Sequence, residues 1–235
     1  MVNTIQAVPQ VTAPWNLNGD GYILLFHFSR EFIHQQGFLA SASAAMFEGA
    51  LGTVMIVDYQ QSDAGPYQEL LFIPGKLCLH QRRAYTISKI YVSTESSVVN
   101  GRSNWGIPKE LAQFDITREG ECDHIEVSQG NKTFAAFSLQ ASRPTIPVTT
   151  AVVPTAFRTI VQPYQGQAFF TTPRGRGTIQ AAKLRSAAID PAYFPDVTQA
   201  RLLTAVKVSN FSLIFPMTEI RSKLNGKIWP VNRKP

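Results

Sequence analysis

The residue best suited to covalent chemistry in this chain is Lys109, which follows Pro108 in a mostly small or apolar stretch, Gly101 to Leu111. Burial removes the hydration of a lysine, disfavours the ammonium form and leaves an amine that can attack a carbonyl. Gly106 permits close approach of a ligand or a neighbouring strand. Lys109 is therefore a candidate Schiff-base nucleophile. The alternative is a surface lysine after a turn, because lysines are rarely buried.

The elements that must position Lys109 are mainly strands. Short blocks rich in β-branched and aromatic residues are bounded by Gly, Pro, Asn, Asp or Ser, as strands separated by turns are. Some blocks alternate in polarity, and others are apolar throughout, which is typical of strands buried on both faces. The predicted strands are Tyr22 to Phe28, Leu51 to Tyr59, Tyr67 to Pro74, Ala84 to Val92, Gln113 to Thr117, Thr133 to Gln140, Ala156 to Pro163, Gln167 to Thr172, Thr178 to Ala187 and Leu203 to Phe215.

Two short helices are predicted between these strands. The first spans Ser29 to Gln36, with Ser29 as its N-terminal cap. The second begins at Ser93 or Thr94, ends by Gly101 and leads the chain to Lys109. The fold class is therefore α+β and mainly antiparallel β, with a curved sheet that partly closes into a β-barrel and a few short helices.

The 235 residues are expected to form a single domain, 1–235, which is long enough to bury about 70% of its unfolded surface. Residues 1–14 are expected to be loosely ordered, and the proline-rich segment 143–154 to cross between two sub-sheets. No signal-peptide pattern occurs at the start, and no apolar run approaches the roughly 20 residues of a membrane span. We therefore expect a cytoplasmic protein without a membrane partner.

The net charge of +6 gathers partly in residues 173–177 and 221–234. A turn and a solvated tail explain these groups better than nucleic acid or anionic lipid, because no binding motif or interleaved aromatic residues accompany them. The histidines lack the spacing of a metal site on one element, so no metal is expected. Phosphate loops, dinucleotide fingerprints and the G-x-S-x-G elbow are also missing from the sequence.

Four features follow one another in a fixed order: Asp63 to Leu70, an apolar strand, Tyr91-Val92 before a short helix, and Gly101-Arg102 before Pro108-Lys109. This order resembles the acetoacetate decarboxylase family over roughly residues 20 to 140. The resemblance implies that Lys109 forms an imine with a small keto acid and that Glu69 lines the same pocket. It further implies that no cofactor is needed, and the family offers a precedent for a homo-oligomer.

The chemistry fits a lysine imine, because a protonated imine accepts the electron pair released as carbon dioxide departs. Glu69 would orient the substrate or move a proton, since a carboxyl in an apolar pocket can do so near neutral pH. The alternative is that Glu69 is only a carboxylate at a strand edge. Lys109 and Glu69 are therefore the candidate catalytic residues.

Several positions depart from the family pattern. Glu110 replaces a second lysine and would stabilise the ammonium of Lys109, unless an extended backbone directs it to the opposite face. No arginine occurs at Gly19 to Tyr22, and no acidic residue within Leu51 to Val57. Arg102 could supply a cation or bond only to backbone carbonyls, so Arg102 and Glu110 are candidate substrate-binding residues. The pocket is expected to be more apolar and to favour a different keto substrate.

Three functions remain open from the sequence. The first is a decarboxylating lyase that acts through Lys109. The second is a non-catalytic carrier of an apolar small molecule in the same barrel, which the loss of polar pocket residues suggests. The third is an aldolase or dehydratase, because iminium formation serves several carbonyl reactions.

Overall fold

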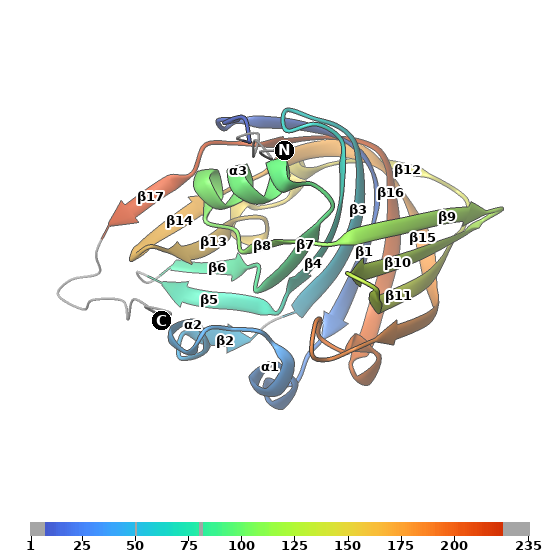
Figure 1. Ribbon diagram of the computed structural model, residues 1–235, viewed down its shortest axis with the longest axis horizontal. Coiled ribbons are helices and arrows are strands. Elements are labelled where there is room, and N and C mark those ends of the chain that lie inside the picture. The colour runs from blue at the N-terminus through green and yellow to red at the C-terminus, as the bar shows by residue number, and fades with distance from the viewer. Residues whose placement is uncertain (1–7, 50, 80–81, 223–235) are drawn as a thin grey trace, which may run out of the picture.

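The computed structural model describes residues 8–49, 51–79 and 82–222, which form two β-sheets with a few short helices (Figure 1). The strands are β1 (Trp15–His27), β2 (Phe47–Gly49), β3 (Leu51–Ser62), β4 (Tyr67–Ile73), β5 (Gly75–Leu79), β6 (Arg82–Thr86), β7 (Lys89–Val92), β8 (Lys109–Leu111), β9 (Gln113–Glu119), β10 (Cys122–Gln129), β11 (Lys132–Ala141), β12 (Ile146–Thr149), β13 (Ile160–Tyr164), β14 (Gln167–Thr171), β15 (Arg174–Ile189), β16 (Arg201–Phe215) and β17 (Glu219–Ser222). The helices are α1 (Arg30–Gln36), α2 (Ser41–Ala44), α3 (Glu95–Trp105), η1 (Thr150–Val152), η2 (Thr155–Phe157) and η3 (Val197–Gln199).

The larger sheet has eleven strands in the order β8-β7-β4-β3-β1-β16-β15-β11-β10-β9, with β12 also paired to β15. Its neighbours are antiparallel except β7 and β8. The smaller sheet has the order β17-β14-β13-β6-β5-β2. The predicted curved and mainly antiparallel architecture with few helices is confirmed. Among the described strands the end strands β8 and β9 do not pair, so the curved sheet does not close into a barrel.

The strands at the centre of the larger sheet are buried on both faces. Along β4, Leu70 and Phe72 face one hydrophobic core, together with residues of β1, β3, β10 and β11. Leu71 and Ile73 face a second core, together with residues of α3 and β7. This alternation explains why β4 is apolar at almost every position in the sequence. The second core surrounds the candidate site.

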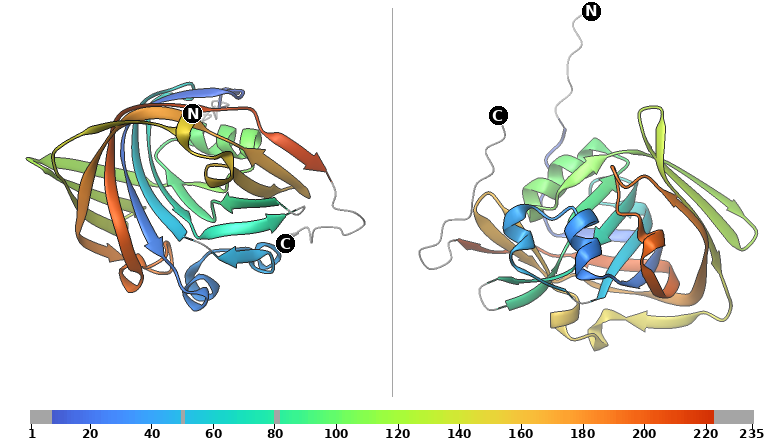
Figure 2. Two further views of the ribbon diagram at one scale, coloured as in Figure 1. Left: turned by 180° about the vertical axis from the view of Figure 1, so that it is seen from behind. Right: turned by 90° about the horizontal axis from the view of Figure 1, so that it is seen from below.

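Helix α1 begins after Ser29, whose hydroxyl accepts a hydrogen bond from the Phe32 amide, as predicted. Helix α3 begins after Thr94 as predicted, but it ends a turn later than expected. Gly101 lies inside the helix, and the helix ends at Gly106, which has a left-handed φ of 64°. Figure 2 shows that α1 and α2 lie together on the opposite side of the molecule from α3.

Two predicted strands need correction. Ala84 to Val92 was expected as one strand, but the chain leaves the smaller sheet after β6 and enters the larger sheet as β7. The first half of Ala156 to Pro163 is the 3-10 helix η2 instead of strand. Strands β2, β5, β8, β10, β12 and β17 were not predicted, because they are short or, as in β10, mostly polar. The basic segment 173–177 is not a turn but the start of β15.

The segment 143–154 follows β11 of the larger sheet, forms β12 beside β15, and precedes β13 of the smaller sheet. Residues 1–7 and most of the basic tail at 221–234 lie outside the described residues. Within the described part of 1–14, the Val11 amide donates a hydrogen bond to Asn100 Oδ1 of α3 at 2.8 Å. That the chain forms one domain stays a prediction. In the part of the chain that the structure covers, no helix is long and apolar enough to cross a membrane.

Candidate active site

Lys109 lies at the start of the edge strand β8, and the register of the larger sheet directs it inward. One row of directly paired residues on five neighbouring strands contains Ile23, Met55, Leu71, Ile90 and Lys109. Paired residues on neighbouring strands share one face of a sheet, so Lys109 faces the same side as Leu71. Glu69 lies two residues before Leu71 on β4 and therefore also faces this side.

The Lys109 amine reaches across β7 to a buried group of polar atoms. Its Nζ lies 3.0 Å from Oε2 of Glu69 and 2.9 Å from Oγ of Ser97, and it is 3.4 Å from the hydroxyl of Tyr67. Lys109 is only 3% exposed and Glu69 only 4%. The alternative of a surface lysine after a turn is therefore excluded, because the ion pair lies in the protein interior.

Two tyrosines complete the surroundings of the ion pair. The Tyr59 hydroxyl donates a hydrogen bond to Oε1 of Glu69 at 3.3 Å. The ring of Tyr67 lies 4.8 Å from the amine, close enough for a cation–π interaction with the ammonium form. Burial, and then the charge of Glu69, raise the pKa of both tyrosines well above the usual range. Both phenols therefore stay protonated and act as neutral dipoles around the carboxylate.

Helix α3 provides the space and the support for the lysine. A Cβ atom at Gly101 would lie 2.7 Å from Cδ of Lys109, so only glycine leaves room for the side chain. Ser97 lies one turn earlier on the same face of the helix and is fully buried. Arg102 Nε donates a hydrogen bond to the backbone oxygen of Lys109 at 2.8 Å. The helix therefore holds both ends of the lysine.

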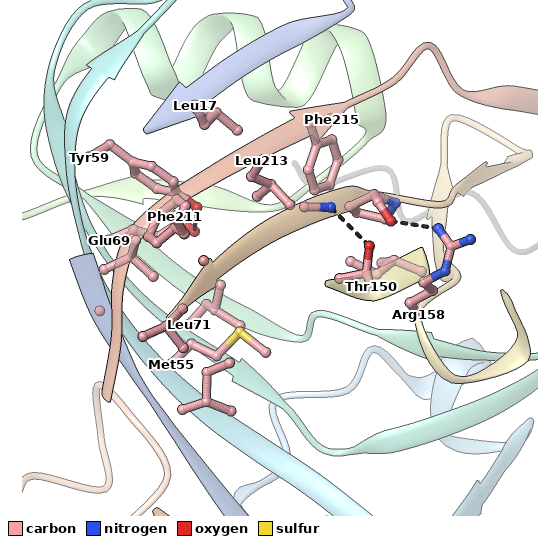
Figure 3. Close-up of a pocket in the computed structure, with 18 of the residues that line it drawn as sticks. Leu17, Met55, Tyr59, Glu69, Leu71, Thr150, Arg158, Phe211, Leu213 and Phe215 are labelled. Atoms are coloured by element: carbon pink, nitrogen blue, oxygen red, sulfur yellow. Dashed lines mark hydrogen bonds between the residues drawn. The ribbon is translucent and has the colours of Figure 1, made fainter. Parts of the chain in front are cut away.

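The lysine lies on the wall of a cavity of about 530 Å³ between the two sheets. Its lining is mostly aliphatic and aromatic, and it includes residues of β1, β3, β4, β15, β16 and the segment around η1 and η2. Figure 3 shows Tyr59, Glu69 and Phe211 at one side of this pocket and Thr150 and Arg158 at the other. Polar side chains therefore lie at both ends of an otherwise apolar space.

The two remaining sequence candidates lie outside this cavity lining. Glu110 points away from the amine and forms an ion pair with Lys89 at 2.6 Å. Arg102 is exposed and bonds to a backbone carbonyl, which was the structural alternative given for it. The geometry supports positioning roles for both residues and no contact with a substrate in the cavity.

The cation that a substrate carboxylate would need is not next to Lys109. Two arginines line the cavity, Arg158 and Arg176. The guanidinium of Arg158 donates hydrogen bonds to the backbone oxygens of Val153, at 3.2 Å, and Pro173, at 2.8 Å. These bonds attach the η1–η2 segment to the start of β15. Arg158 therefore shapes the wall of the cavity.

Sequence reasoning missed Ser97, Tyr59 and the roles of Tyr67 and Gly101. Two signals were present in the sequence. Tyr67 precedes Glu69 by two residues and so shares its strand face, and Ser97 precedes Gly101 by one helical turn. Tyr59 had no such signal, because only the pairing of β3 with β4 places it opposite Tyr67. Among the described residues, no cluster of three or more His, Cys, Asp or Glu side chains could hold a metal ion.

Comparison with solved structures places this arrangement in a known fold. Acetoacetate decarboxylase from Legionella pneumophila has a TM-score of 0.69 and 13% identity, over 94% of this chain and 92% of that one. An acetoacetate decarboxylase-like enzyme from Sphingomonas wittichii has a TM-score of 0.67 and 13% identity, over 94% and 98%. The enduracididine biosynthesis enzyme MppR, complexed with the condensation product of pyruvate and imidazole 4-carboxaldehyde, has a TM-score of 0.62 and 14% identity. The match covers 92% of this chain and 91% of that one. At these identities the likeness defines the fold alone.

A comparison of the sequence with family models identifies the family of this chain. The model of the acetoacetate decarboxylase (ADC) family matches residues 42–172, more than half of the chain, and this span contains Glu69, Ser97 and Lys109. The chain therefore belongs to the acetoacetate decarboxylase family, and the resemblance noted in the sequence is confirmed. A search of curated proteins gave no match.

Proposed function

We propose that this protein is a Schiff-base lyase that decarboxylates a 3-oxo acid through Lys109. The observation that supports the proposal best is the position of the amine, 3.0 Å from Glu69 and buried on the wall of an apolar cavity. A lysine is rarely placed in such an environment unless its chemistry is used. Membership of the decarboxylase family supports the same reaction class.

The first step needs a free amine. The Lys109 ammonium passes a proton to Glu69, which it contacts directly. The amine then adds to the 3-oxo carbon, the protonated Glu69 supplies the proton with which the hydroxyl leaves as water, and a protonated imine remains. Ser97 accepts a hydrogen bond from the same nitrogen and so fixes the direction of attack.

The protonated imine then acts as the electron acceptor. The bond between the carboxylate and the adjacent carbon breaks, its electron pair forms an enamine, and carbon dioxide leaves. Glu69, protonated again by a proton from solvent, gives this proton to the enamine carbon, and water hydrolyses the resulting protonated imine to free the ketone and the lysine ammonium. An apolar cavity favours this sequence, because the substrate carboxylate loses its charge as carbon dioxide forms.

The proposal is tested by borohydride trapping with a panel of 3-oxo acids and 1,3-dicarbonyls, followed by mass spectrometry of the Lys109 peptide. We expect a reduced adduct on Lys109 together with release of carbon dioxide from the 3-oxo acids. Absence of an adduct with every compound of the panel would count decisively against the proposal.

An aldolase or dehydratase is the second candidate, because a lysine imine serves several carbonyl reactions. The structural relative MppR binds a condensation product of pyruvate and an aldehyde. Incubation with pyruvate and aldehydes, followed by product analysis, separates this candidate from a decarboxylase. A pure carrier would retain ligand in the Lys109→Ala variant, and the parent protein would show no turnover.

A further inference from the structure

The strand pairing of the larger sheet shows how far the cavity extends from Lys109. A second row of paired residues starts at Glu69 and crosses four neighbouring strands, and all its members line the cavity: Glu69, Val57, Gly21, Val208 and Ile179. At about 4.8 Å between strands, the four steps from β4 to β15 cover about 19 Å along the curved sheet. The cavity therefore continues far beyond the atoms that react.

The cavity volume gives the same result independently. A volume of 530 Å³ corresponds to about 18 water-sized groups, at about 30 Å³ each. A small acid such as 3-oxobutanoate fills less than half of this space by the same scale. The remainder would have to hold water against aliphatic and aromatic walls, although water needs polar partners to be stable in a cavity.

The walls of the remaining space are apolar. Beyond Glu69 the two rows present Val57, Met55, Val208 and Ile179, and the ring of Phe211 lies against Tyr59 at the reacting end. Two arginines also line the cavity, Arg158 and Arg176, and the half-buried Arg158 is hydrogen-bonded to two backbone oxygens. Such a surface stabilises methylene groups and rings by removing them from water.

We propose that the substrate is a 3-oxo acid with a large apolar body, of roughly ten carbons beyond the reacting group. Its 3-oxo carbon lies at Lys109, and its apolar body follows the concave face of the sheet toward Ile179. This inference rests on the proposed Schiff-base function and adds the class of substrate. Ile179 is a specificity-determining residue that contacts the distal end of the substrate.

The test is a chain-length series with the unmodified protein: 3-oxobutanoate, 3-oxohexanoate, 3-oxodecanoate and 3-oxotetradecanoate, below their micelle concentrations. We expect kcat/KM for carbon dioxide release to rise about two- to fourfold with each added methylene until the cavity is filled. Trapping efficiency on Lys109 should follow the same order. Equal values at all lengths, or a maximum at 3-oxobutanoate, would overturn the substrate class and leave the Schiff-base chemistry standing.

Two variants locate the distal end. Ile179→Trp fills the far part of the cavity and should lower the ratio of kcat/KM for 3-oxodecanoate over 3-oxohexanoate by at least about tenfold. Ile214→Trp is the matched control, because Ile214 is 46% exposed on the neighbouring strand and does not line the cavity. An unchanged ratio in Ile179→Trp would contradict the assigned path. If no acid of any length gives an adduct on Lys109, the proposed function itself fails.

Discussion

Two lysines in this protein have nearly the same partners and very different surroundings. Lys109 pairs with Glu69 at 3.0 Å beside Tyr59 and Tyr67. On the other face of the same sheet, Lys207 pairs with Asp123 at 2.6 Å, and Asp123 also accepts a hydrogen bond from Tyr22 at 2.7 Å. Both are lysine–carboxylate–tyrosine clusters, and their strands belong to one sheet.

The clusters differ in the space next to the amine. The Lys109 cluster borders a cavity of about 530 Å³, whereas the hollow beside Lys207 holds about 20 Å³, the size of one water molecule. The Lys207 side chain is also 19% exposed, against 4% for Lys109. A buried ion pair is therefore not sufficient for imine chemistry; the amine must also face a space that admits a carbonyl compound.

The largest expected effect is the difference in turnover between variants of the two lysines. Lys109→Met should lower carbon dioxide release at least about a thousandfold, because no other amine of the described residues faces the cavity. Lys207→Met should retain turnover. The double variant Lys109→Met/Glu69→Gln guards against misfolding, since it removes both members of the buried pair. Equal losses in the two lysine variants, with circular dichroism unchanged, would remove the distinction between the clusters.

Replacing the carboxylates should also lower kcat more in the Lys109 cluster than in the Lys207 cluster. Glu69→Gln should lower kcat by about 10²- to 10⁴-fold, because an amide cannot accept and return the proton. Asp123→Asn should leave kcat close to that of the parent and lower the free energy of unfolding by about 1–3 kcal/mol, because Lys207 loses its partner. Steady-state kinetics and urea denaturation measure the two quantities. A kcat loss in Asp123→Asn as large as in Glu69→Gln would show that the clusters are coupled.

A smaller effect tests how strictly the amine is positioned. Gly101→Ala puts a Cβ atom 2.7 Å from Cδ of Lys109, so the lysine must move. We expect kcat/KM to fall about a hundredfold, as for a displacement of about 1 Å, while α3 remains folded. Ser103→Ala on the exposed face of the same helix is the control and should match the parent. Parent-like trapping rates in Gly101→Ala would refute this positioning role.

The clusters should behave alike in alkaline solution. Burial, followed by the hydrogen bond to Asp123, raises the pKa of Tyr22, as burial and Glu69 raise the pKa of Tyr59 and Tyr67. The unfolded chain loses these protons near pH 10 and the native protein holds them, so stability is complete below that pH and falls above it. The slope is up to about 1.4 kcal/mol per pH unit for each tyrosine. Denaturation series from pH 9 to 12 should therefore be less steep for Tyr59→Phe than for the parent.

Local patterns predicted most of the elements. Ser29 and Thr94 cap their helices as expected, and the long apolar runs became β3, β4 and β16. The failures occurred where tertiary contacts prevailed over local signals. Gly101 was predicted to end the helix. It lies inside α3 instead, because a Cβ atom at this position would collide with the side chain of Lys109. The block Ala84 to Val92 read as one strand, but it divides between two sheets that the sequence does not distinguish.

The surroundings of Lys109 in the sequence were enough to single it out, because a lysine in an apolar segment has few ordinary uses, and Glu69 was added by the resemblance to the acetoacetate decarboxylase family. Their meeting depends on the tertiary structure, since 40 residues and two strand pairings separate them. The same holds for the choice between Lys109 and Lys207. Both lysines occur in strands of ordinary composition, and only the packing around the sheet leaves an open space on one of its faces and a filled core on the other. Free space depends on how distant segments pack, and no local pattern records it.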